Sequence, residues 1–131
     1  MKKTTLLNSD LSYIIATMGH TEMLVIADAG LPIPSSTERV DLALVRGVPG
    51  AIETLSAVLS EMQVERAILA IETQEINPDF EMNVRELLPG VSVDFVPHEE
   101  LKRLSADSRA VVRTGECKPY ANVILVSGVA F

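Results

Sequence analysis

Three short, uninterrupted apolar runs constrain the fold of this chain more than any other feature. Residues 23–27, 67–71 and 123–126 each place four or five apolar side chains in a row. Runs of this length are typical of strands buried on both faces, because a half-exposed strand would alternate with polar residues. Such strands need a covering layer on each side. The runs therefore predict a sheet with helices on both faces.

Helical patterns alternate with these runs along the chain. Asn8 can cap a helix over residues 9–18, in which apolar side chains recur at i, i+3, i+4 and i+7. Further helices are expected over 50–59, 78–88 and 97–104, and further strands over 39–45, 91–96 and 110–112. No repeat or linker interrupts the pattern. We therefore expect one α/β domain over residues 1–131, a three-layer sandwich with a central mixed β-sheet flanked by helices.

Charge and the length of the apolar stretches limit which partners the protein can bind and where in the cell it can lie. Acidic residues outnumber basic ones 18 to 11, for a net charge of −7, which argues against nucleic acid or an anionic membrane as a partner. The longest apolar stretch, residues 123–131, is far shorter than the ~20 residues that span a bilayer. Met1-Lys2-Lys3 is similar to the start of a signal peptide, but Asn8, Ser9 and Asp10 interrupt the apolar segment that should follow. We expect a cytoplasmic protein.

The common catalytic motifs are missing. The chain has no GxGxxG, GxxxxGK[ST], HExxH or GxSxG pattern, which removes the usual nucleotide, zinc-protease and serine-hydrolase interpretations. Cys117 is the only cysteine and the two histidines lie far apart. We therefore expect no metal and no cofactor.

The remaining candidates for chemistry are few. His20 and His98 can act as acid or base near neutral pH, and Lys102 lies one helical turn after His98. Tyr120 and Asn122 would share one side of an extended segment, although a turn after Pro119 is as common an explanation. The segment 113–116 fits a charged β-turn better than a phosphate site. Glu72, Glu75, Glu81 and Glu86 are expected on solvated surfaces.

The order and spacing of several short motifs resemble a known family over essentially the whole chain. The motifs are Gly19-His20, Asp28-Ala29-Gly30-Leu31-Pro32, His98-Glu99-Glu100-x-Lys102, Arg113-Thr114-Gly115-Glu116 and Pro119-Tyr120-Ala121-Asn122. Together they are similar to the D-ribose pyranase family, which belongs with the fucose mutarotases. The resemblance implies a cofactor-free interconversion of the pyranose and furanose forms of D-ribose, which supplies a kinase with the furanose.

The resemblance also implies roles for individual residues. His20 would be the catalytic proton donor, and Asp28, His98, Lys102 and the segment Tyr120-Ala121-Asn122 would bind the sugar. Whether His98 is a base or only a sugar ligand stays open. The family forms ring-shaped homo-oligomers, so a pentamer or decamer is expected.

Ring opening of a sugar suits these residues independently. One group must protonate the ring oxygen while another takes the proton of the anomeric hydroxyl, and histidine can serve either need. Because nothing is oxidised or reduced in the reaction, acid/base groups suffice. Three alternatives remain: a mutarotase acting on fucose or a similar sugar, a noncatalytic sugar-binding accessory of ribose uptake, and a purely structural oligomer.

The spacing of His20 and Asp28 adds a geometric expectation. The two residues flank the strand at 23–27, and eight residues of extended chain span roughly 26 Å. A ribose ring is much smaller than that separation. If both residues touch one sugar, one of them comes from a neighbouring chain, which predicts sites at subunit interfaces.

Overall fold

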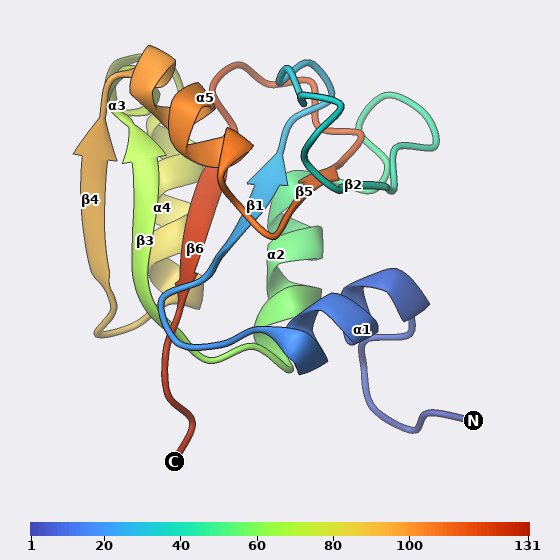
Figure 1. The fold of residues 1–131 in the computed structure, drawn as a ribbon. Coiled ribbons are helices and arrows are strands. Elements are labelled where there is room, and N and C mark those ends of the chain that lie inside the picture. The colour runs from blue at the N-terminus through green and yellow to red at the C-terminus, as the bar shows by residue number, and fades with distance from the viewer.

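The computed structural model describes residues 1–131 and is built around one six-stranded sheet (Figure 1). The strands are β1 (Met23–Ala27), β2 (Arg39–Asp41), β3 (Val64–Ala70), β4 (Ser92–Val96), β5 (Ala110–Arg113) and β6 (Val123–Ser127). Their order across the sheet is β2-β5-β1-β6-β3-β4. Only β6 runs antiparallel to its neighbours, β1 and β3, while the other pairs are parallel. The expectation of a mixed sheet is confirmed.

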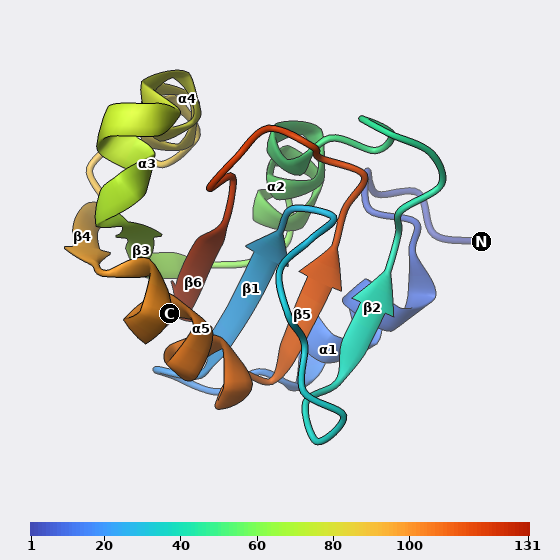
Figure 2. The ribbon, with the colours of Figure 1, turned by 90° about the horizontal axis from the view of Figure 1, so that it is seen from above.

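Helices cover both faces of the sheet, but unequally. They are α1 (Ser9–Thr17), α2 (Ala51–Leu59), α3 (Ile71–Ile76), α4 (Pro78–Leu87) and α5 (His98–Ala106). α1, α2 and α4 supply buried residues to the larger hydrophobic cluster on one face. On the other face, α5 and the segment after β1 cover a smaller cluster, as the view from above shows (Figure 2). The three-layer sandwich is thus confirmed.

The central strand β1 shows why an uninterrupted apolar run was needed. Leu24 and Ile26 pack into the larger cluster, whereas Val25 and Ala27 pack into the smaller one. All four residues are fully buried. Because successive side chains of a strand point to opposite faces, a polar residue at any of these positions would lie in a core.

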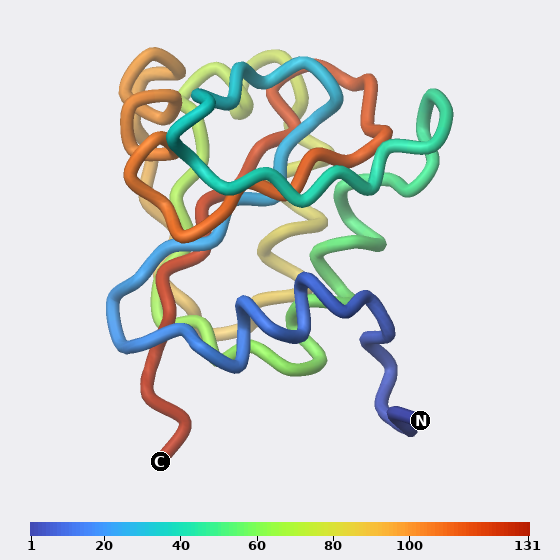
Figure 3. The backbone as a smooth tube through the Cα atoms, turned by 45° about the vertical axis from the view of Figure 1, so that its right-hand side comes forward, coloured from blue at the N-terminus to red at the C-terminus, as the bar shows by residue number.

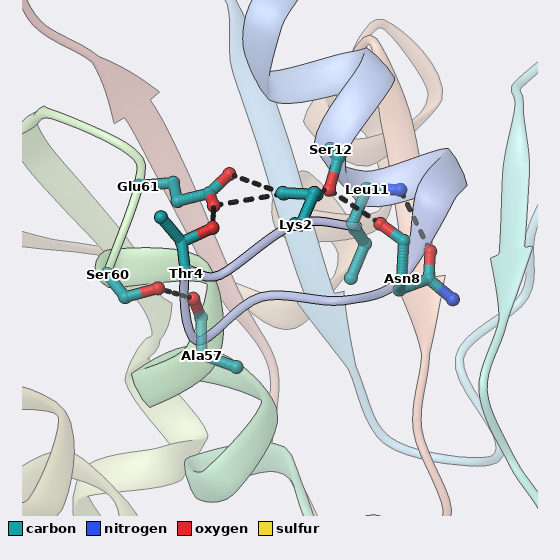
Figure 4. Close-up of polar contacts among 8 residues, drawn as sticks. All are labelled: Lys2, Thr4, Asn8, Leu11, Ser12, Ala57, Ser60 and Glu61. Carbon is teal, nitrogen blue, oxygen red and sulfur yellow. Dashed lines mark hydrogen bonds and ion pairs between the residues drawn. The ribbon is translucent and has the colours of Figure 1, made fainter.

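The segment before α1 is tied to the end of α2 (Figure 4). Lys2 Nζ lies 3.0 Å from Glu61 Oε1 and donates to Ser12 Oγ at 2.7 Å, while Thr4 Oγ1 donates to Glu61 at 2.8 Å. The hydrogen bonds from Lys2 and Thr4 lower the pKa of Glu61.

Asn8 Oδ1 accepts from Leu11 N at 2.9 Å, which confirms the predicted cap of α1.

Two predicted elements need correction. The strand expected over 39–45 ends at Asp41, because the chain then folds back on itself: Leu44 N donates to Val48 O, and Gly47 takes a positive φ of 80°. The strand expected over 67–71 starts earlier and ends at Ala70. Ile71 opens α3, a six-residue helix that no pattern predicted, because only Thr73 of it is buried.

The two ends of the sheet differ in what they carry (Figure 3). At the carboxyl ends of the parallel strands lie the segment after β1, α3, the start of α5 and the loop before β6. The α1–β1 connection and both termini lie toward the opposite end. No helix is both long enough and apolar enough to cross a membrane.

Candidate active site

A cavity of about 360 Å³ lies at the carboxyl ends of the parallel strands. Three of its polar residues come from different parts of the fold: Asp28 directly follows β1, His98 is the first residue of α5, and Tyr120 lies in the loop before β6. The remaining lining residues are Gly30, Leu31, Pro32 and Pro119. Open α/β sheets bind ligands at this edge, and the volume falls in the range of small-molecule sites.

Asp28 is held in place by Asn122, the residue directly before β6. Asn122 Oδ1 accepts from Asp28 N at 2.8 Å, and its Nδ2 donates to Asp28 Oδ2 at 3.1 Å. Asp28 Oδ1 also accepts from Gly30 N at 2.9 Å. Each carboxylate oxygen therefore accepts one hydrogen bond from the chain and keeps a lone pair for a ligand. Asn122 itself is 1% exposed and does not line the cavity.

His98 presents an unsatisfied nitrogen. Its backbone N donates to Glu72 Oε2 at 3.0 Å, while its ring lies edge-on to Tyr120, with 5.0 Å between centroids and an angle of 89°. His98 Nδ1 is buried and has no hydrogen-bond partner in the chain. Because such a group is costly to leave unpaired, this nitrogen is suited to a ligand hydroxyl.

Tyr120 lies in a turn, and this corrects one expectation. Its φ of +54° is in the left-handed region, so Tyr120 and Asn122 do not share one side of an extended segment. Tyr120 faces the cavity, whereas Asn122 points into the protein beside Asp28. The turn after Pro119, the other reading of this segment, is the one observed.

Two further residues expected to bind sugar do not line this cavity. Ala121 is fully buried in the larger hydrophobic cluster. Lys102 Nζ lies 2.7 Å from Glu99 Oε1, and the hydrogen bond from Lys102 lowers the pKa of Glu99. Within one chain, the structure therefore brings Asp28, His98 and Tyr120 together, with Asn122 behind them.

His20 lies at the other end of the sheet, as the spacing predicted. It precedes β1 by three residues, and its Nε2 is 2.8 Å from Glu65 Oε2. The side chains of the pair are 52% and 44% exposed. β1 separates His20 from Asp28, so one chain does not place both residues on one small ligand.

A larger hollow of about 650 Å³ adjoins the cavity and shares Asp28, Gly30 and Pro119 with it. Arg113 lines it, but its NH1 pairs with Asp41 at 3.1 Å and its Nε donates to Ala29 O. Although burial raises the pKa of Asp41, the hydrogen bond from Arg113 holds it below its usual value. The segment 113–116 thus forms internal contacts, as expected of a charged turn.

Sequence reasoning missed the residues that support the cavity. Glu72, expected on a solvated surface, accepts from the backbone of His98. Thr73 Oγ1 donates to Tyr120 O and Asn77 Nδ2 to Pro119 O, both at 2.9 Å. Only Asn77 carried a usable signal, because asparagine before Pro78 is a common helix start. No set of three or more His, Cys, Asp or Glu side chains is grouped to hold a metal ion.

This fold and cavity define a small α/β protein whose cavity is lined by a carboxylate, an imidazole and a phenol, a set suited to a compact polar ligand. The chain belongs to the RbsD / FucU transport protein family, whose sequence model matches residues 1–130. The expected family is thereby confirmed.

Individual relatives sharpen the comparison. The chain is 55% identical to a D-ribose pyranase of Clostridium perfringens (strain SM101 / Type A) over 131 residues, all of both proteins. It is 56% identical to a D-ribose pyranase of Actinobacillus succinogenes, again over the full length of both. Among solved structures, Bacillus subtilis RbsD complexed with D-ribose matches with a TM-score of 0.96 and 44% identity, covering 100% of each chain. The fucose mutarotase of Streptococcus pneumoniae, complexed with L-fucose, has a TM-score of 0.84 at 23% identity and shares the fold.

Proposed function

We propose that this chain is an isomerase that interconverts the pyranose and furanose forms of D-ribose. The observation that carries the proposal is the 55% identity with a D-ribose pyranase over the whole of both chains. The close match to RbsD complexed with D-ribose supports the same conclusion. The proposal places the reaction in the cytoplasm, where the furanose supplies a kinase.

The comparisons favour ribose over fucose as the substrate. Identity is 44% with the RbsD that binds D-ribose, but 23% with the mutarotase that binds L-fucose. A noncatalytic sugar-binding role would need the cavity but no proton donor. Catalysed exchange therefore separates the enzyme from the binding accessory.

The cavity holds the sugar by matched hydrogen bonds. The two carboxylate oxygens of Asp28 accept from sugar hydroxyls, and His98 Nδ1 pairs with another hydroxyl. The ring of Tyr120 offers an apolar face to the C–H side of the sugar. Asn122 acts through Asp28. Lys102 can contact the sugar only if its ion pair with Glu99 breaks. Ala121 is fully buried, and its backbone connects Tyr120 to Asn122.

His20 supplies the proton from a neighbouring chain. It protonates the ring oxygen while a second group takes the proton of the anomeric hydroxyl, so the bond from the anomeric carbon to the ring oxygen breaks and the hemiacetal opens to the aldehyde. Rotation and attack by a different hydroxyl then close the other ring form. Proton transfer is sufficient, so the reaction needs no cofactor. Since His20 and Asp28 lie at opposite ends of β1, we propose a ring-shaped homo-oligomer, a pentamer or decamer, with sites at its interfaces.

Saturation-transfer NMR on D-ribose at equilibrium tests the reaction directly. Irradiating a pyranose anomeric signal should attenuate the furanose signals more strongly with protein than without it. L-fucose under identical conditions serves as the matched control and should respond less. Exchange no faster than in buffer would refute the proposed isomerase activity. A larger response from L-fucose than from D-ribose would mean that fucose is the preferred substrate.

A further inference from the structure

Two neighbouring side chains of α3 hydrogen-bond to two residues that line the cavity. Glu72 Oε2 accepts from the backbone N of His98 at 3.0 Å, and Thr73 Oγ1 donates to the backbone O of Tyr120 at 2.9 Å. α3 has only six residues and makes no other hydrogen bond to the residues that line the cavity. This short helix therefore connects the two ring-bearing residues of the site.

The hydrogen bond from Thr73 to Tyr120 stabilises an unfavourable backbone conformation. A φ of +54° is uncommon for a residue with a Cβ, and an aromatic side chain does not favour it. Thr73 is fully buried, so its hydroxyl has no water to compete for it. Asn77, which follows α3, donates to Pro119 O at 2.9 Å while its Oδ1 caps α4. The consecutive carbonyl oxygens of Pro119 and Tyr120 thus each accept a hydrogen bond from a side chain in or next to α3.

The contact with His98 replaces a missing helix cap. Pro97 occupies the cap position of α5 and makes no side-chain hydrogen bond there. The Glu72 carboxylate accepts the free N–H of the first helical residue instead, where negative charge is also favoured by the helix dipole. His98 is therefore anchored at its backbone, and its ring can rest against Tyr120.

We propose that α3 is a positioning element for the ligand site: Glu72 and Thr73 fix His98 and Tyr120 relative to each other in the conformation that binds the sugar. Neither residue touches the sugar. Loss of either contact lowers the population of the binding-competent site, which weakens apparent affinity in proportion. The proposal rests on the proposed function for the identity of the sugar, but not for the geometry of the two rings.

Paired substitutions test the roles of the two side chains. Thr73→Val keeps the shape but removes the donor, and Thr73→Ser restores the donor. Likewise Glu72→Ala removes the acceptor, and Glu72→Gln restores an acceptor without charge. We expect Thr73→Val and Glu72→Ala to raise KM for ribose by about tenfold, and the conservative partners to stay within about threefold of the parent protein. The value of kcat should change less than KM, because neither Glu72 nor Thr73 hydrogen-bonds to the proposed proton donor His20.

Tyrosine fluorescence gives a readout independent of turnover. The chain has two tyrosines and no tryptophan, so in a Tyr13→Phe background Tyr120 is the only strong emitter. Tyr13 is 69% exposed and remote from the cavity residues. Quenching of Tyr120 by acrylamide should rise about twofold in Thr73→Val and return to the parent value in Thr73→Ser. A purely structural role would lower the melting temperature and leave the quenching of the folded protein unchanged.

The outcomes are distinguishable. Raised KM with raised quenching, both reversed by the conservative variants, supports the proposal. Unchanged quenching, equal effects of Val and Ser, or a loss confined to kcat overturns it. If Thr73→Val does not fold, Asn77→Asp keeps the oxygen that caps α4 but loses the donor to Pro119, and the same quenching criteria apply. If the parent protein does not exchange ribose forms, the proposed function fails, whereas quenching still decides the positioning role.

Discussion

The two ends of β1 carry the two histidine regions of the chain, and they are built in different ways. At the carboxyl end, buried side chains such as Asn122 and Thr73 hold the cavity walls by hydrogen bonds inside one chain. At the amino end, the His20 side chain has Glu65 as its one hydrogen-bond partner, and both side chains are about half exposed. The comparison teaches that the geometry of the cavity is set within one chain, while the proposed proton donor faces outward.

The largest expected effect follows from removing the outward-facing group. His20→Ala should slow catalysed ribose exchange by about 10²-fold or more, because one positioned acid is lost. Ribose affinity, measured by calorimetric titration, should stay within about threefold, since the cavity is formed at the other end of β1. Near-normal exchange in a folded and assembled variant would show that His20 is not the acid.

Mixing two impaired variants, at a ribose concentration well below saturation, tests whether the two ends of β1 meet between chains. His20→Ala subunits keep an intact cavity, and Asn122→Ala subunits keep an intact His20. In a randomly mixed ring about a quarter of the sites should combine the two intact halves and regain exchange activity. Each variant taken alone through the same unfolding and reassembly is the control. No recovery despite verified mixing would mean that His20 is not part of the sugar site, because one chain holds His20 and Asp28 at opposite ends of β1.

A smaller effect is expected from the carboxyl end. Asn122→Ala removes the two hydrogen bonds between Asn122 and Asp28, so ribose affinity should fall by about tenfold. Asn8→Ala is a matched control, because Asn8 also hydrogen-bonds locally, as the cap of α1, but lies outside the cavity. It should lower the melting temperature and leave ribose affinity unchanged. Equal affinity losses in both variants would contradict the assignment of Asn122.

The smallest effect concerns the ion pair near the N-terminus, which serves neither histidine region. Since folding lowers the pKa of Glu61, the ionised carboxylate stabilises the protein above the unfolded pKa, and that stabilisation is lost as pH falls through the folded pKa. Urea unfolding of Glu61→Gln should therefore show a small deficit at pH 7 that disappears at low pH. A deficit that persists in acid would mean that charge is not its cause.

Much of the fold could be predicted from the sequence, for physical reasons that apply to particular residues. The run at 23–27 required burial on both faces, and Asn8 was a recognisable cap. α3 could not be predicted, because it has too few residues for a periodic apolar face and one buried side chain. The fold-back after Asp41 depends on hydrogen bonds of residues 44–48 that no propensity specifies.

The candidate site was predictable as a set of residue types, but its internal arrangement was not. Asp28 and His98 follow predicted strands, so their meeting at one sheet edge could be anticipated. The left-handed turn at Tyr120 reversed the expected relation between Tyr120 and Asn122. Glu72 had the appearance of any solvated glutamate, because its partner is a backbone N–H distant in sequence.

Because β6 runs antiparallel to β1, it connects the cavity at one end of the sheet to the His20 region at the other end. The strand begins directly after Asn122, and at its far end Ser127 exchanges backbone hydrogen bonds with Thr21 and Glu22, beside His20. It is buried along its whole length between two partners, so it cannot slide. In the proposed ring, the distance from the cavity of a subunit to the His20 that it supplies to a neighbour's cavity is therefore the length of one strand. In a closed ring that unit length repeats at every interface, so a change in β6 would alter all sites together.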